Sequence, residues 1–387
     1  MIFVNTEKFE IKSWCNNPEA GAIEQAKNLA NLPFIHQHIA LMPDAHMGYG
    51  CPIGTVAALD KAICVNLIGV DIGCGVYACK TTLKDITTEQ LKHIMSQIRK
   101  DVPLGFNKHK IPCSENDMPE TSESIKNFLI TPEHYLNAQK SLGTLGGGNH
   151  FIEIQKGSDG HIWFMIHSGS RNLGKQVADY YNKLAIEQNE RWFSPVPKEH
   201  QLAFLPVNHF LGQAYLKEME FCLAFAKKNR EKIAEHVLNA IKLNTDGGKI
   251  IHYDVHHNYV TIENHYGKNV WIHRKGATSA KKGEIGIIPG SQGTASYIVS
   301  GKGNKESFMS CSHGAGRTMS RTKARKELNL EEEQAKLDSK GIIHSIRGKK
   351  DLDEASSAYK DIDTVMEEQK NLVEILIKLE PLAVIKG

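Results

Sequence analysis

AICVNLIGVDIGCGVYAC, residues Ala62–Cys79, is a run of β-branched and other apolar residues broken by glycines. Such a run predicts buried strands joined by a tight turn, because glycine tolerates backbone conformations that other residues avoid. Five further segments share this texture and are also expected to form strands and turns. They are Leu41–Ala58, Gly143–Gln155, His161–Gly169, Ile250–Val260 and Gly283–Gly301.

Amphipathic segments alternate with these strands and predict helices. They are Pro18–Ala30, Thr88–Arg99, Ser122–Lys140, Gln176–Trp192, Gly212–Lys242, Met319–Leu337 and Ile362–Leu379. Asp361 is the expected N-cap of the last of them. No low-complexity linker or short repeat marks a domain boundary. We therefore expect an α+β fold in a single large domain, residues 1–387, with helices surrounding a β-rich core and glycine-rich loops at the strand ends.

The composition is typical of a soluble globular protein, with 41% apolar and 24% charged residues. The net charge of +3 is too small to indicate nucleic-acid binding by itself. Charged and polar residues interrupt the apolar stretch from Thr55 to Cys79, which argues against a membrane span. The eight cysteines form no CxxC pair and the N-terminus resembles no signal peptide, so we expect reduced thiols, a cytoplasmic location and no membrane partner.

Carboxylate, thiol and imidazole side chains recur beside glycines at the ends of the predicted strands. The set comprises Asp71, Cys74, His150, His167 and the neighbouring pair His256-His257. Each residue alone is more often structural than a metal ligand. Together they suit a site in which a thiolate bridges two ions, and manganese, iron, zinc or cobalt would accept such ligands. The pattern therefore predicts a metal site without naming the metal.

Three glycine- and hydroxyl-rich segments with cations lie close together near the C-terminal side of the chain. They are Arg274–Thr278, Ile288–Ser296 and His313–Arg317. Their backbone N–H groups, hydroxyls and cations are what polyphosphate binding requires. Neither a Walker loop nor a strand–GxGxxG–helix unit is present, which argues against P-loop and Rossmann nucleotide binders. His313 could ligate a metal, move a proton or attack phosphorus.

These motifs together resemble the RtcB family of RNA-splicing ligases along nearly the whole chain. The matching segments are Met42–Gly48, Gly69–Gly75, Gly146–Glu153, His167–Arg171, His256–Tyr259, Arg274–Thr278, Pro289–Ser296, Ser312–Ser320, Ala358–Asp361 and Val384–Gly387. The resemblance implies an enzyme that joins RNA 3′-phosphate or 2′,3′-cyclic phosphate ends to 5′-hydroxyl ends, in tRNA splicing or RNA repair. It also implies GTP and two Mn²⁺ per active site, an RNA partner and a monomer, and it leaves open an activating or repair partner protein.

The resemblance further implies roles for individual residues. His313 resembles the nucleophile that takes GMP. The resemblance also implies two sets of manganese ligands. The first set is Asp71, Cys74 and His150, and the second is Cys74, His167 and His257. The guanylate would contact Asn149, His150, Phe151, Glu153, His257, Asn258, Pro289, Gly290, Ser291, Gln292, Ser296, His313, Gly314, Ala315, Gly316, Tyr359 and Lys386. Phosphates of RNA or GTP would lie against Arg171, Lys275 and Arg317.

Alternatives remain for some residues and for the function. His46 is expected either to stabilise its turn or to approach RNA, and Arg321–Lys326 either to be a solvated helix face or to guide RNA. A dinuclear metal phosphoesterase with His313 as general acid fits the same residues, as does an RNA-binding protein with a degenerate site. Because every metal position and the nucleophile position are filled, we favour the ligase.

Overall fold

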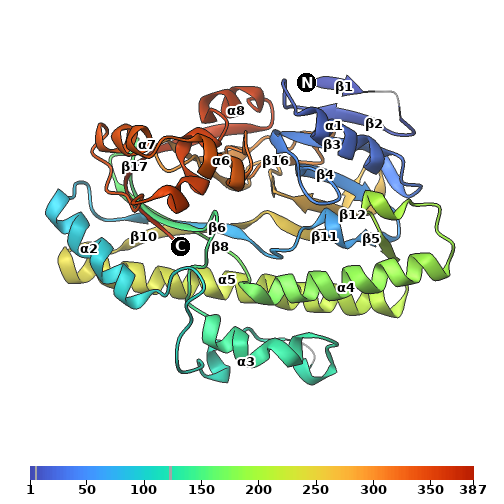
Figure 1. Ribbon diagram of the computed structural model, residues 1–387, viewed down its shortest axis with the longest axis horizontal. Coiled ribbons are helices and arrows are strands. Elements are labelled where there is room, and N and C mark those ends of the chain that lie inside the picture. Colours follow the sequence, from blue (N-terminus) through green and yellow to red (C-terminus); the bar gives the residue numbers. More distant parts are fainter. Residues whose placement is uncertain (5–6, 122–123) are drawn as a thin grey trace.

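The computed structural model describes residues 1–4, 7–121 and 124–387. In these ranges the strands form a six-stranded sheet, a seven-stranded sheet and two short pairs (Figure 1). The six-stranded sheet has the order β1 (Ile2–Val4), β2 (Glu10–Ser13), β3 (Ile35–His46), β4 (Ile53–Leu59), β12 (Lys268–Lys275) and β11 (Asn258–His265). The seven-stranded sheet has the order β10 (Lys249–His256), β6 (Gly75–Thr81), β8 (Ile162–Ser168), β7 (Phe151–Gly157), β17 (Val373–Lys386), β15 (Ser296–Gly301) and β14 (Ile285–Ile288). The short pairs are β5 (Ala62–Cys64) with β9 (Phe204–Pro206) and β13 (Ala277–Ser279) with β16 (Ser310–Ser312).

Helices lie on both sides of this β-rich core. They are α1 (Ala20–Ala30), α2 (Thr88–Asp101), α3 (Thr131–Ser141), α4 (Asn172–Arg191), α5 (Phe210–Asn244), α6 (Arg321–Glu327), α7 (Leu330–Asp338) and α8 (Ile362–Glu368). Figure 1 shows α4 and α5 along one side of the molecule, with α3 beyond them and α6, α7 and α8 on the opposite side. The expected α+β fold is thereby confirmed.

Helix α5 packs with α2 on the seven-stranded sheet. Ile233, Val237 and Ile241 of α5 are spaced by four residues, so they fall on one side of the helix. They are buried in one cluster with Ile152 and Phe164 of the sheet. Burial of each such side chain stabilises the fold by about 1.5–3 kcal/mol. This packing fixes the sheet whose strand ends carry the predicted site.

The antiparallel order of the seven-stranded sheet gathers strand ends that are distant in the sequence. Gly75, the first residue of β6, pairs with Ser168 at the end of β8 and with His256 at the end of β10. Cys74 immediately precedes β6, and His257 immediately follows β10. Both residues therefore lie at the same edge of the sheet.

Strands β7 and β17 bring further residues to that edge. Phe151, the first residue of β7, pairs with His167 of β8 and with Lys386 at the end of β17. His150 precedes β7 directly, so its side chain projects from the same edge as His167. The topology thus explains how residues from four separated segments can form one site.

The C-terminal segment differs from its prediction. Helix α8 begins after Asp361, whose carboxylate accepts hydrogen bonds from two N–H groups of the first turn, as expected of an N-cap. The helix ends at Glu368, and Val373–Lys386 forms β17 between β15 and β7. The expected helix up to Leu379 is therefore wrong in its second half, because pairing with two distant strands overrides the local amphipathic pattern.

The expected helix Met319–Leu337 is two helices, α6 and α7. Leu328 is extended, and Asn329 then caps α7 by accepting a hydrogen bond from the Glu332 N–H. Asparagine is a preferred N-cap because its side chain satisfies a backbone donor that the helix leaves free. A local capping preference therefore divides a segment whose periodicity is continuous.

Two other predicted elements have different bounds. Ile250–Val260 is divided between β10 and β11, which belong to different sheets, and His257 lies at the division. For the expected helix Ser122–Lys140, residues 122–123 lie outside the described residues, and α3 begins only at Thr131. Its Pro132 occupies the first turn, where no N–H is needed.

All eight cysteines are free thiols, as expected. None of the helices within the described ranges combines the length and the apolar character that a bilayer crossing needs.

Candidate active site

The two predicted metal-ligand sets form one cluster. Cys74 Sγ lies 3.5 Å from His150 Nε2 and 3.2 Å from His167 Nε2. His150 Nε2 lies 3.1 Å from Asp71 Oδ2, and His167 Nε2 lies 3.4 Å from His257 Nε2. Within each set the possible ligand atoms are all within 4.8 Å of one another. The structure thus brings together every residue predicted as a metal ligand, with Cys74 shared by both sets.

The hydrogen bonds around this cluster are compatible with bound cations. His150 Nδ1 and His167 Nδ1 lie 3.0 and 3.2 Å from the backbone carbonyls of Leu145 and Asn149. A carbonyl only accepts hydrogen bonds, so each Nδ1 carries a proton. Burial lowers the pKa of His167 well below its usual value, so this ring is neutral and its Nε2 lone pair faces the Cys74 sulfur. A cation between the two atoms would bind both.

The Cys74 thiol also favours a positive charge nearby. Burial, and after it the Asp71 carboxylate, raises the pKa of this thiol well above its usual value. A thiolate at this position therefore needs a cation to offset the loss of hydration. His257 Nδ1, in addition, is a buried atom without a hydrogen-bond partner among the described residues. The donor set fits divalent ions that accept sulfur, nitrogen and oxygen ligands.

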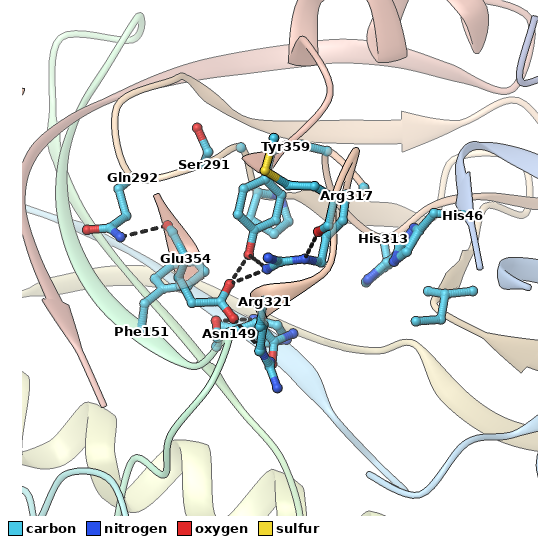
Figure 2. Close-up of a pocket in the computed structure, with 18 of the residues that line it drawn as sticks. His46, Asn149, Phe151, Ser291, Gln292, His313, Arg317, Arg321, Glu354 and Tyr359 are labelled. Atoms are coloured by element: carbon cyan, nitrogen blue, oxygen red, sulfur yellow. Dashed lines mark hydrogen bonds and ion pairs between the residues drawn. The ribbon is translucent and has the colours of Figure 1, made fainter. Parts of the chain in front are cut away.

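A cavity of about 600 Å³ adjoins the cluster and is large enough for a nucleotide. Figure 2 shows His313 and His46 toward one end of the cavity and Ser291 and Gln292 toward the other, with Arg317 between them. His167 lines both the cavity and the cluster. The two features are therefore parts of one site.

Most residues predicted to contact a guanylate line this cavity. They are Asn149, Phe151, Glu153, Pro289, Gly290, Ser291, Gln292, His313, Gly314, Ala315, Gly316, Tyr359 and Lys386. Asn258 and Ser296 do not, and neither do His150 and His257, which belong to the predicted metal-ligand sets. The Asn258 amide is hydrogen-bonded to the backbone of Asp71 and Gly276, and Ser296 Oγ accepts the Gly290 N–H. These two side chains support the walls of the site and do not face the cavity.

Two charged groups in the cavity wall have unused hydrogen-bonding capacity. Glu153 is 3% exposed, and its Oε1 has no partner among the described residues, whereas Oε2 accepts a hydrogen bond from Gln155. Burial raises the pKa of Glu153 well above its usual value. Lys386 Nζ lies 5.7 Å from the centre of the Phe151 ring and has no hydrogen-bond acceptor in the described chain. A ligand with paired donors and a separate acceptor would satisfy these groups.

His313 stands between the cavity and the cluster. Its ring centre lies 4.7 Å from that of His257, and the residue also lines the cavity. Asp44, which is fully buried in β3, accepts hydrogen bonds from His313 Nδ1 at 2.6 Å and from the His313 N–H at 3.1 Å. Because Nδ1 donates to this carboxylate, Nε2 is left with the lone pair. A Cβ on Gly276 would lie 3.0 Å from His313 Cε1, so a larger residue there would crowd the ring.

The three residues predicted to bind phosphate already bind protein groups. Lys275 Nζ donates to three backbone carbonyls, which uses all three of its donors, and it does not line the cavity. In this structure Lys275 therefore has a structural role, and its contact with phosphate stays a prediction. Arg317 lines the cavity but donates to Glu354, to the Tyr359 hydroxyl and to two carbonyls. Arg171 donates to the Thr144 hydroxyl and to a carbonyl.

Sequence reasoning missed the roles of two residues of the site, Asp44 and Glu354. Glu354 is 3% exposed and accepts hydrogen bonds from Arg317 and from Arg321 Nε. Although burial raises it, Lys386, Arg321 and Arg317 together hold the pKa of Glu354 below its usual value. Asp44 lies in a segment that carries the family resemblance, but nothing local to it indicates a contact with a residue 269 positions away. The contact between Asp44 and His313 becomes visible only when the fold brings the two segments together.

The structure also addresses the two alternatives for His46 and the basic run. His46 Nδ1 is hydrogen-bonded to the Asp44 carbonyl at 2.8 Å, and burial lowers its pKa to about 4. This contact lies at the end of β3, where a strand stands in place of the expected turn, and the residue also borders the cavity. In the basic run, Arg321 reaches the cavity wall, whereas Lys323, Arg325 and Lys326 are exposed on α6. The run is therefore mainly a solvated helix face.

Fold and site together define an α+β protein in which two adjoining sets of possible metal ligands lie beside a nucleotide-sized cavity. The sequence matches the family described as tRNA-splicing ligase RtcB over residues 25–135 and 120–387. It is 36% identical to the RNA-splicing ligase RtcB of Escherichia coli strain K12, over 99% of each chain. It is 33% identical to the tRNA-splicing ligase RtcB of Methanococcus maripaludis, over 96% of this chain and 92% of that one. The protein belongs to the RtcB family.

Proposed function

We propose that this protein is an RNA ligase that joins a 3′-phosphate or 2′,3′-cyclic phosphate end to a 5′-hydroxyl end, with GTP and Mn²⁺, in tRNA splicing or RNA repair. One observation carries the proposal: His313, held by Asp44, stands between a nucleotide-sized cavity and two metal-ligand sets. The names of the relatives support ligation of RNA. Because Asp44 comes from the six-stranded sheet and the cluster from the seven-stranded one, we treat residues 1–387 as one catalytic domain.

The cavity supports guanine as the base. Guanine offers two neighbouring donors, N1–H and the exocyclic N2–H, which adenine lacks. The Glu153 carboxylate has one oxygen without a partner and can accept from both. Lys386, on the same wall, has donors available for the guanine or ribose oxygens. A buried carboxylate left unpaired by ATP would disfavour that nucleotide.

The first chemical step follows from the orientation of His313. Its Nε2 lone pair attacks the α-phosphorus of GTP, the N–P bond forms, and the bond to the bridging oxygen breaks to release pyrophosphate. Asp44 keeps the proton on Nδ1 and stabilises the positive charge that develops on the ring. When bound, two Mn²⁺ ions neutralise charge on the phosphoryl oxygens and orient the in-line displacement.

Two transfers to RNA complete the reaction. An oxygen of the RNA 3′-phosphate attacks the GMP phosphorus, and the N–P bond breaks so that His313 leaves as a neutral imidazole. The product is an RNA(3′)pp(5′)G end. The 5′-hydroxyl oxygen of the second RNA end then attacks the 3′-phosphorus, loses its proton and expels GMP, which leaves a 3′,5′-phosphodiester. A 2′,3′-cyclic phosphate is first hydrolysed to the 3′-monophosphate.

The test of this proposal is a covalent intermediate. Incubation with α-³²P-GTP and Mn²⁺ should label the protein with a bond that is stable to alkali and labile to acid, as a phosphoramidate is. His313→Ala should reduce the label to background, whereas His256→Ala, which alters a histidine outside both ligand sets, should keep it. Hydrolysis of a phosphoester without GTP and without label would instead establish a metal phosphoesterase. RNA binding without either activity would establish a degenerate site.

Glu153→Gln should weaken GTP binding by about 10- to 100-fold, the range expected when a hydrogen-bonded charge is removed. The amide keeps one acceptor but turns a donor toward the donors of guanine. Burial raises the pKa of Glu153, so wild-type affinity should increase as the pH rises and the carboxylate ionises. That increase should disappear in the variant. Isothermal titration with GTP and ATP across pH measures both effects, and an unchanged preference for GTP would contradict the assignment.

A further inference from the structure

Phe106 is a fully exposed aromatic residue next to the candidate site. Its side chain is 101% exposed, so it makes no packing contribution to the fold. It lies in a turn that the Asn107 N–H closes by donating to the Leu104 carbonyl at 3.1 Å. A single exposed phenylalanine is common on protein surfaces and carries no argument by itself. What distinguishes Phe106 is its position beside the candidate site and the charged residues around it.

The backbone beside Phe106 is fastened to the loop that carries the metal-ligand cluster. The Gly105 N–H donates to the Gly146 carbonyl at 3.0 Å, and Arg171 Nη2 donates to the Gly105 carbonyl at 3.1 Å. A Cβ on Gly146 would collide with the Arg171 guanidinium and would lie 2.7 Å from His150 Nδ1. Phe106 therefore directly follows Gly105, and Gly105 is hydrogen-bonded to Gly146, which lies against the predicted metal ligand His150.

Two lysines, Lys108 and Lys110, follow Phe106 in the sequence. Both lysines are exposed, and the Lys110 ammonium has no partner among the described residues. Lys108 Nζ has a single long contact, 3.5 Å to Asn137 Oδ1. The loop itself is held in place, because the His109 N–H donates to the Lys140 carbonyl at 2.9 Å. An anchored loop thus presents an aromatic ring and two available cations beside the cluster.

We propose that Phe106 stacks on an unpaired nucleobase of an RNA end at the metal-ligand cluster, with Lys108 and Lys110 contacting its phosphates. This inference rests on the proposed ligase function. Single-stranded RNA is recognised by aromatic stacking combined with cations that follow the backbone. Stacking tolerates any sequence because every base has a π-face, which suits an enzyme that joins ends. The flanking cations favour a polyanion over a protein partner at this surface.

Short RNAs carrying 2-aminopurine test the stacking directly, because stacking quenches its fluorescence. One RNA has the probe as the last base before a 3′-phosphate, and another has it as the first base after a 5′-hydroxyl. Wild-type protein should quench at least one of them. Phe106→Ala should abolish that quenching and weaken RNA binding by about tenfold, the effect typical of one lost base stack. Phe106→Trp should retain both, whereas Phe106→Leu, which keeps apolar bulk without a ring, should behave like alanine.

Phe193→Ala is the matched control, since Phe193 is 92% exposed but lies beyond the end of α4 and outside the site. It should quench and bind as the wild type does. Wild-type quenching and affinity in folded Phe106→Ala would overturn the stacking role and leave this surface to a protein partner. Labelling of wild-type protein by GTP, measured in parallel, reports on the ligase proposal independently of RNA. Its absence would overturn that proposal, whereas label with unaltered quenching in Phe106→Ala would overturn only the inference about Phe106.

Discussion

Cys74→Ala is expected to remove metal binding from both ligand sets and to abolish the guanylylation of His313. The sulfur of Cys74 lies 3.5 Å from His150 Nε2 and 3.2 Å from His167 Nε2, so one substitution deletes a ligand from each set. Loss of an outer-shell partner already costs about 10- to 100-fold in metal affinity, and loss of a shared ligand should exceed that range. When protein dialysed against Mn²⁺ is analysed for metal, the manganese content should be two ions per chain in the wild type and close to none in Cys74→Ala.

The comparison with single-set variants makes this prediction specific. Asp71 and His257 each belong to one set, so Asp71→Asn and His257→Gln should each retain one ion per chain. Cys79→Ala serves as the matched control, because Cys79 is also fully buried and lies on β6, five residues after Cys74, outside both sets. It should keep two ions and full labelling by GTP. Two ions per chain in folded Cys74→Ala would exclude a shared ligand.

The cluster of predicted metal ligands could be anticipated from the sequence because its residue pattern is local. Asp71 and Cys74 flank one turn, and each histidine adjoins a strand end where polar residues follow an apolar run. Such positions reach a sheet edge whatever the details of the fold. The antiparallel order then decides which edges coincide, and here Gly75 pairs with both Ser168 and His256.

Side-chain direction, in contrast, could not be predicted from residue type. Lys275 has the charge and the glycine neighbour of a phosphate ligand, yet the pairing of β12 turns its ammonium toward three carbonyls of the Tyr49–Asn66 segment. Asn258 likewise follows the predicted ligand His257 but holds the backbone of Asp71. A strand sends alternate residues to opposite faces, so a shift of one position decides between ligand and support.

Partnerships across long sequence separations were also beyond local reasoning. Residues 373–379, the first half of β17, were expected to be helical because a helix-like pattern is a local property, whereas pairing with β7 and β15 is not. Glu354 lies in a short 3₁₀ segment that carries no recognisable motif, yet it binds Arg317 and Arg321 at the cavity wall. Topology alone makes these contacts, and the most consequential of them is the one between Asp44 and His313.

Asp44→Asn should slow the guanylylation of His313 by on the order of 10²- to 10⁴-fold, the scale seen when a histidine loses the carboxylate that fixes its tautomer. Asp44 Oδ2 accepts from both Nδ1 and the backbone N–H of His313. An amide cannot stabilise the developing positive charge, and its NH₂ group can donate to Nδ1, which moves the proton to Nε2 and removes the attacking lone pair. Asp44 is thus assigned as a positioning residue.

Single-turnover labelling with α-³²P-GTP measures the rate, and GTP titration measures the affinity separately. Asp44 does not line the cavity, so the dissociation constant for GTP should stay within a few-fold of wild type while the rate falls. Glu218→Gln is the matched control, because Glu218 is another fully buried carboxylate that accepts backbone N–H groups, and it does not line the cavity. It should lower the melting temperature without changing the labelling rate of folded protein. A near-normal rate in folded Asp44→Asn would show that His313 attacks without this carboxylate, whereas weakened GTP binding at an unchanged rate would assign Asp44 to the cavity.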